Sequence, residues 1–169
     1  MRCWIVVFFL LLIASSGAEQ IVEHGGRDIV TFDVPDVEYK TTREGKYTRT
    51  YFSQKIGSGN LRITVTSKGW MSELKAEQRY QSDKRDKRNH QGTRLRDDAE
   101  VEGAMRALCY STTTPYRGEA IVLYTPDFRC ELLVTGTEEA ADAVEPTYQR
   151  LMETLKVVPR TKIRDIKIE

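Results

Sequence analysis

Side chains that commonly carry out chemistry occur in this sequence, but not at spacings that make a site. His24 and His90 are the only histidines, and neither has another histidine or a cysteine at a spacing typical of metal ligands. No serine lies in a Gly-x-Ser-x-Gly motif, and neither Cys109 nor Cys130 has a histidine nearby in the sequence. Adjacent carboxylates, which are frequent in so charged a chain, usually face solvent. The sequence therefore predicts no catalytic residue, no metal ion and no cofactor.

Residues 84–96 form a basic segment with a single acidic residue, Asp86. The basic side chains are Lys84, Arg85, Lys87, Arg88, Arg94 and Arg96. Such a run is typical of a solvated loop, and it also suits a docking surface for an acidic partner, an anionic lipid or a cell-wall polymer. Interleaved aromatic residues, on which nucleic-acid bases stack, are missing, so no nucleic-acid partner is expected. In a solvated loop, reversing the charge of Arg85, Lys87 and Arg88 leaves stability nearly unchanged.

An export signal is predicted over residues 1–18. Arg2 precedes an apolar run over 4–13, and the small residues Ser16 and Ala18 suit cleavage before Glu19. No later stretch approaches the ~20 apolar residues that a membrane span needs. We therefore expect a soluble protein without a membrane span, exported to a periplasm or secreted after cleavage near Ala18.

The mature chain is long enough for one domain with its own core. We expect a flexible lead-in over 19–28, a single domain over 29–158 and a charged tail over 159–169. The sequence holds 26 Lys and Arg against 25 Asp and Glu, and Arg2 leaves with the signal, so the mature chain is neutral with histidines uncharged. A general polyanion binder is therefore not indicated.

Cys109 and Cys130 are the two cysteines that remain once Cys3 leaves with the signal. An even count in an oxidising compartment favours a disulfide between them. Strand geometry opposes it, because in a simple meander the strand at 119–125 separates the two cysteine strands by two spacings of ~4.8 Å, beyond the reach of a bridge. A bridge and two quiet buried thiols both remain open.

Apolar alternation and turn residues predict the elements that would position these groups. A strand is expected at 29–32, a hairpin over 47–66 around Gly57, and a helix over 73–81 capped by Ser72. Residues 82–98 are expected to form a solvated loop, or the end of that helix running into a loop, and three strands follow at 99–113, 119–125 and 128–134. A closing helix runs to Pro159, with Pro146 either kinking it or standing in its first turn. Leu132 and Leu151 are predicted to be core residues.

Together these elements predict an α+β fold, in which an antiparallel sheet has its helices packed on one face. The layout resembles the PsbP-like family. The opening strand IVTFDVP (29–35) matches its pattern, and so does EAIVLYTPDFRCELLVTGTEEAADAVEPTYQRLMETLKV (119–157), which looks like the closing portion of exported bacterial members. A cystatin-like curved sheet is the alternative fold.

The PsbP-like resemblance implies a non-enzymatic binding or assembly accessory, because such domains mostly serve as subunits, chaperones or adaptors. We therefore expect an exported module that contacts a protein partner of the cell envelope or of the secreted fraction. Two other functions remain open. One is a small extracytoplasmic hydrolase with a site assembled from scattered residues, and the other is a polyanion-binding envelope protein that uses the 84–96 segment.

Overall fold

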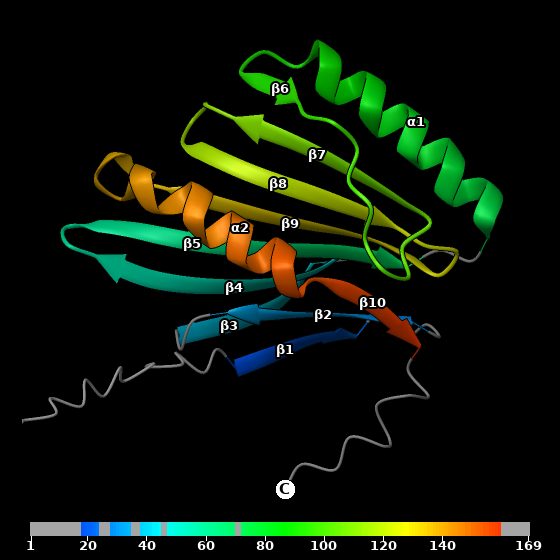
Figure 1. Ribbon diagram of the computed structural model, residues 1–169, viewed down its shortest axis with the longest axis horizontal. Coiled ribbons are helices and arrows are strands. Elements are labelled where there is room, and N and C mark those ends of the chain that lie inside the picture. Colours follow the sequence, from blue (N-terminus) through cyan, green and yellow to red (C-terminus); the bar gives the residue numbers. More distant parts are fainter. Residues whose placement is uncertain (1–17, 24–27, 35–37, 45–46, 70–71, 160–169) are drawn as a thin grey trace, which may run out of the picture.

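The structure, a computed structural model, describes residues 18–23, 28–34, 38–44, 47–69 and 72–159. Its largest element is a seven-stranded antiparallel sheet in the order β3-β4-β5-β9-β8-β7-β6 (Figure 1). The strands are β3 (Glu38–Glu44), β4 (Tyr47–Ile56), β5 (Gly59–Gly69), β6 (Thr93–Leu95), β7 (Arg106–Thr112), β8 (Arg117–Tyr124) and β9 (Phe128–Gly136). The expected signal peptide lies outside the described residues, except for Ala18.

A second, three-stranded sheet lies beside the first, in the order β1-β2-β10 (Figure 1). Its strands are β1 (Ala18–Glu23), β2 (Asp28–Val34) and β10 (Lys156–Pro159). The expected flexible lead-in over 19–28 is wrong in its first half, because the backbone of β1 pairs with β2 along its whole length. The charged tail begins at Pro159, the last residue of β10, and its remainder lies outside the described residues.

The predicted hairpin over 47–66 is confirmed, because alternation and turn residues agree there. β4 and β5 pair up to Ile56 and Gly59, which leaves a two-residue turn in which Gly57 takes a φ of 60°. A positive φ suits glycine at the first central position of the turns that match strand twist. Leu61, Ile63 and Val65 of β5 are buried, as their alternation requires. β8 and β9 form the second hairpin.

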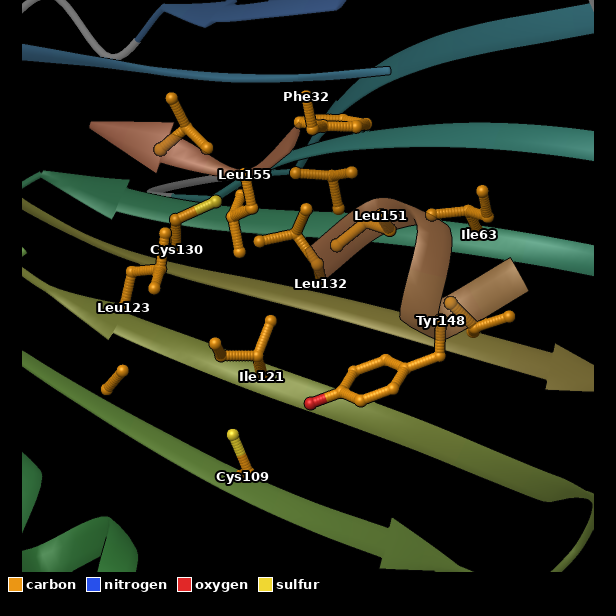
Figure 2. Packing of buried hydrophobic residues seen from close by; sticks show 14 of the residues in the cluster. Phe32, Ile63, Cys109, Ile121, Leu123, Cys130, Leu132, Tyr148, Leu151 and Leu155 are labelled. Carbon is orange, nitrogen blue, oxygen red and sulfur yellow. The ribbon is translucent and has the colours of Figure 1, made fainter. Parts of the chain in front are cut away.

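The main core lies on one face of the large sheet, beneath helix α2 (Val144–Thr154). Figure 2 shows Leu132 and Leu151 pointing into this core, with Ile121 and Leu123 of β8 beside them. Leu132 is 0% and Leu151 1% exposed, so the predicted inward faces of both elements are confirmed. Phe32 of the small sheet reaches the same cluster and meets the Phe52 ring edge-on at 6.0 Å.

Helix α1 (Glu73–Asn89) packs on the opposite face of the sheet. Its Ala76 and Tyr80 belong to a second cluster with Ala120, Val122 and Tyr124 of β8, while the intervening residues of β8 face α2. The α+β class is therefore confirmed, but the prediction that both helices pack on one face is wrong. The cystatin-like alternative does not describe a sheet with a helix on each face.

Helix α1 is also longer than the sequence predicts. Ser72 caps it as expected, with its hydroxyl accepting from Lys75 N at 3.2 Å, but the helix continues to Asn89, through about the first half of the 82–98 segment. Lys and Arg are good helix formers, so their abundance there does not oppose a helix. The missing aliphatic stripe is replaced by a polar one, because Asp83 is 4% exposed beneath the helix.

The closing helix comes in two parts. Thr137 precedes a 3₁₀ helix, η1 (Glu138–Ala143), and α2 then begins at Val144 with Pro146 in its first turn. Of the two alternatives for Pro146, the first-turn position is therefore the observed one. The helix ends at Thr154, and the chain then forms strand β10, so the expectation of a helix up to Pro159 is wrong.

The strand expected over 99–113 begins only at Arg106. Residues 96–105 form an irregular segment that crosses the α2 side of the sheet, where Ala99, Val101 and Ala104 pack against the main core (Figure 1). Gly103 is required there, because a Cβ at this position would lie 2.1 Å from the Val157 carbonyl oxygen. Within the described ranges, no helix has the length and apolar character to cross a membrane.

Candidate functional site

A basic groove lies at the β6 end of the large sheet, between this edge strand and α1. It has a volume of about 530 Å³. We call it the edge groove, and it is lined by Lys84, Arg88, Thr93, Arg94, Leu95, Arg96, Asp97 and Asp98. The helix contributes two cations and the strand region two more. Four of the six basic residues singled out in the sequence are therefore brought together here.

Two of the four cations are held by carboxylates. Lys84 Nζ lies 2.7 Å from Asp98 Oδ2, and the Tyr80 hydroxyl donates to the same oxygen at 2.6 Å. Arg96 Nη2 lies 2.7 Å from Glu119 Oε1 and 3.1 Å from Glu145 Oε2, so it ties the groove to β8 and α2. These ion pairs compensate the charges of Lys84 and Arg96, so they remove part of the positive charge of the edge groove.

Arg88 and Arg94 carry the unpaired positive charge of the edge groove. Both side chains are exposed, and within the described part of the chain neither has a hydrogen bond or an ion pair. Exposed guanidinium groups are planar, permanently charged donors that match carboxylates and phosphates in a bidentate geometry. The groove therefore offers two free cations to an anionic ligand.

The other two predicted residues do not line the groove. Arg85 is exposed on the side of α1 opposite the stripe that contacts the sheet. Lys87 is turned inward instead: its Nζ lies 3.4 Å from Glu131 Oε1 and 3.9 Å from the centre of the Tyr110 ring. The solvated-loop interpretation is therefore wrong for Lys87, because this side chain helps to hold α1 on the sheet.

Sequence analysis missed a buried ionic network centred on Arg129, which lies beneath α1. Arg129 is 8% exposed, and its Nε donates to Asp83 Oδ2 at 2.7 Å while its Nη1 donates to Glu131 Oε2 at 3.1 Å. The Tyr124 hydroxyl donates to Asp83 at 2.8 Å, and the Tyr110 hydroxyl donates to Glu131. Only the alternation of charged residues with apolar ones in β9 hints at it, because Arg129 and Glu131 share the face of the strand that lies under α1.

Electrostatic interactions within the network favour the charged forms of Glu131 and Arg129. Burial raises the pKa of Glu131, but Arg129, Lys87 and the Tyr110 hydroxyl together bring it below its ordinary value. For Arg129, burial disfavours the cation, but Glu131 and Asp83 more than compensate and raise its pKa. The carboxylates of Asp83 and Glu131 are thus each paired with cations, as in a structural network of ion pairs.

Unlike Glu131, Glu119 has a pKa above its ordinary value. It is 4% exposed, and burial raises its pKa although Arg96 lowers it. Its Oε1 accepts from Arg96, whereas Oε2 is buried with no hydrogen-bond partner among the described residues. Among the described residues, the Glu119 carboxylate is therefore only half satisfied.

The two cysteines are free and buried. In the register of the sheet, Cys109 of β7 faces Ile121 and Cys130 of β9 faces Leu123, so β8 lies between them (Figure 2). The possible Cys109–Cys130 disulfide is therefore not formed, and the geometric objection to it is confirmed. Burial raises the pKa of Cys109, and it raises that of Cys130 to about 12.

Two further hollows flank the edge groove. One, of about 460 Å³, lies between Tyr80 and the 98–107 region, and the other, of about 200 Å³, lies near His90 and Tyr116. The first contains the hydrogen bond from the Tyr80 hydroxyl to Asp98 Oδ2 at 2.6 Å, and in the second the Thr93 hydroxyl and His90 Nδ1 lie 3.2 Å apart. Over the residues that the structure places, no three or more His, Cys, Asp or Glu side chains gather as metal ligands would.

Comparison with known proteins gives a fold and no family. No protein-family model matches the sequence, and neither does any curated protein. Among solved structures, the chain is similar to LpqN, a protein involved in cell envelope biogenesis of Mycobacterium tuberculosis. The TM-score is 0.54 at 15% sequence identity, over 85% of this chain and 92% of that chain. This likeness supports the α+β fold across nearly the whole described region.

Proposed function

We propose that this protein is an exported, non-enzymatic accessory module of the cell envelope, and that it binds an acidic protein partner through the edge groove. The observation that carries the proposal is the convergence of Lys84, Arg88, Arg94 and Arg96 on one hollow of about 530 Å³. Because Arg88 and Arg94 have no partner in the described part of the chain, the positive charge there is available to a ligand.

The compartment is supported from two directions. Residues 1–18 have the charge, apolar run and small residues of a cleavable export signal. The fold is similar to that of LpqN, which is involved in cell envelope biogenesis. The PsbP-like resemblance of 119–157 also favours a binding or assembly role over catalysis. Buried Asp83 and partly buried Glu131 favour the same role, because each carboxylate is bonded to Arg129 beneath α1.

The charged surface favours a single docking site over general adhesion to polyanions. The sequence as a whole carries a formal charge of only +1, so attraction of a ligand depends on the local field of the groove. A local patch of this kind mainly accelerates association and sets orientation, and exposed charges separated by more than ~8 Å are screened at physiological salt. Binding should therefore weaken with salt and depend on Arg88 and Arg94.

The test compares three forms of the processed protein: wild type, Arg88→Glu/Arg94→Glu and the control Arg85→Glu. Arg85 carries the same charge on the same helix but lies outside the groove, so its reversal shows what reversing one exposed arginine of α1 does to association when the groove is left intact. Each form is immobilised and exposed to envelope extract, and association with the recovered partner is measured from 0.05 to 0.5 M salt. We expect the double variant to associate roughly tenfold more slowly while the control does not. Equal binding by all three forms refutes the groove, as does a preference for anionic lipid vesicles over the partner.

A further inference from the structure

The edge groove runs along an open strand edge, which suggests how a partner binds there. β6 is the last strand of the large sheet, and only its inner side is paired, with β7. Arg96 N donates to Cys109 O at 3.0 Å, and Thr113 N donates to Gly92 O at 2.9 Å. These bonds fix the ladder, so that Gly92, Arg94 and Arg96 point their backbone groups toward β7.

In an antiparallel ladder the residues between such bonded positions point their N–H and C=O groups away from the partner strand. Thr93 and Leu95 are the residues between, so their outward groups face the edge groove. Thr93 N is used by a turn bond to His90 O at 3.2 Å, whereas Leu95 N–H has no acceptor among the described residues. An unpaired edge with a free donor and free acceptors can accept another strand.

The charges around this edge define the chemistry of the added strand. Along a strand, successive side chains point to opposite faces. Lys84 and Arg88 reach the edge from the α1 side of the sheet, while Arg94 and Arg96 stand on the other side, where Arg96 meets Glu145 of α2. Asp97 and Asp98 line the same groove, and Lys84 and Arg96 are already paired with carboxylates. The cations that a carboxylate of an added strand can meet are therefore Arg88 on one face and Arg94 on the other.

We propose that an extended acidic peptide segment of the partner adds to β6 as an eighth strand, pairing with the backbone of Thr93 and Leu95. This inference rests on the proposed function, since it names the form in which the acidic partner enters the groove. A lipid headgroup or an anionic polymer is disfavoured by the same observation, because neither supplies alternating N–H and C=O groups to pair with a strand edge.

The experiment uses a defined probe, the peptide (Glu-Thr)₄ with blocked ends, in which threonine favours the strand conformation. The matched control peptide is (Lys-Thr)₄. Amide hydrogen exchange of the processed protein is measured by NMR with and without each peptide. We expect (Glu-Thr)₄ to slow exchange of the Leu95 amide at least tenfold, while the Arg94 amide, already bonded to β7, changes little. (Lys-Thr)₄ should leave both amides unchanged.

Two further arms separate strand pairing from charge attraction. The first is (Glu-Thr)₄ with every backbone nitrogen methylated, which keeps all its charges but cannot donate; we expect its affinity to fall roughly tenfold or more. The second is Leu95→Pro, which removes an outward N–H and the leucine side chain that packs against the α1 cluster but leaves the bonds to β7; we expect it to bind (Glu-Thr)₄ roughly tenfold more weakly, while the matched Leu95→Val binds as the wild type does. Inorganic polyphosphate serves as an anion without a peptide backbone, and it should leave the Leu95 amide unprotected.

The outcomes distinguish this inference from the function on which it rests. If methylated and unmethylated peptides bind equally, or if Leu95 exchanges at the same rate with (Glu-Thr)₄ bound, strand addition is refuted. Should binding still depend on Arg88 and Arg94 in that case, the groove remains an acidic-partner site that works through charge alone. If the Arg88→Glu/Arg94→Glu variant binds the peptide and the partner as the wild type does, both proposals fail.

Discussion

Replacing Arg129 by methionine tests whether the buried ionic network holds α1 on the sheet. Arg129 is 8% exposed and lies between the buried carboxylate of Asp83, 2.7 Å from Nε, and the partly buried carboxylate of Glu131, 3.1 Å from Nη1. Removing one partner of a buried ion pair costs about 3–5 kcal/mol, because the remaining charge loses its compensation. Arg79 still lies 2.9 Å from Asp83 and Lys87 3.4 Å from Glu131, so we expect the lower end, about 3 kcal/mol.

The pH dependence of this loss gives a second, independent signature. In the wild type the pKa of Glu131 is lowered on folding, so its contribution to stability is present above its unfolded pKa and is lost as the pH falls. Without Arg129, burial dominates and raises the pKa of Glu131, so the folded variant takes up a proton and regains stability as the pH falls. The difference between the two proteins should therefore be largest near pH 7 and shrink toward pH 4.

The assay is urea unfolding of wild type, Arg129→Met and the exposed-site control Arg85→Met at pH 7 and pH 4. A loss of about 3 kcal/mol corresponds to a fall in Tm of roughly 6–12 °C for a domain of this size. The control should change the free energy of unfolding by less than about 0.5 kcal/mol. A loss below about 1 kcal/mol for Arg129→Met at pH 7, or a loss that grows on acidification, would refute the reasoning.

The burial of core residues and the ion pair of Lys87 give three further predictions. Leu132→Ala and Leu151→Ala should each lower the free energy of unfolding by about 2–5 kcal/mol in urea melts, and a change well below that range would mean that the core is misplaced. Lys87→Glu should lower Tm clearly more than Arg85→Glu does, since it adds a negative charge to a network that already holds Asp83 and Glu131. Equal melting curves would contradict the inward position of Lys87. Cys130, with a pKa of about 12, should resist alkylation at pH 8 in the folded protein and react once unfolded in urea.

The hairpins and the last helix could be predicted from sequence because local signals and burial agree there. Leu61, Ile63 and Val65 alternate with polar residues, and each is buried. Pro146 and the acidic residues before it mark the start of α2. These signals are short-range, and they require no knowledge of the partner strand.

Helix α1 could not be predicted in full because its contacts with the sheet are largely polar. Hydrophobic periodicity detects a helix only when apolar side chains face inward. Here Asp83 and Lys87 face inward, and their partners Arg129 and Glu131 are more than forty positions away in the sequence. The irregular 96–105 segment was missed for a similar reason, since its alanines pack on the core without a period that marks a strand.

The charge count of the 84–96 segment overstated the positive charge that is available to a ligand, because ion pairs compensate several of the six cations. Lys84, Lys87 and Arg96 are all paired with carboxylates, and Arg85 faces away from the groove. Within the edge groove, Arg88 and Arg94 are the cations without an ion pair among the described residues, and the exposed Asp97 on the same lining offsets part of their charge, so the field that reaches a ligand is much weaker than six cations would give. Salt should therefore weaken binding only modestly, and the affinity of a partner must come mainly from short-range contacts. The open backbone of β6 is the surface inside the groove that can supply them.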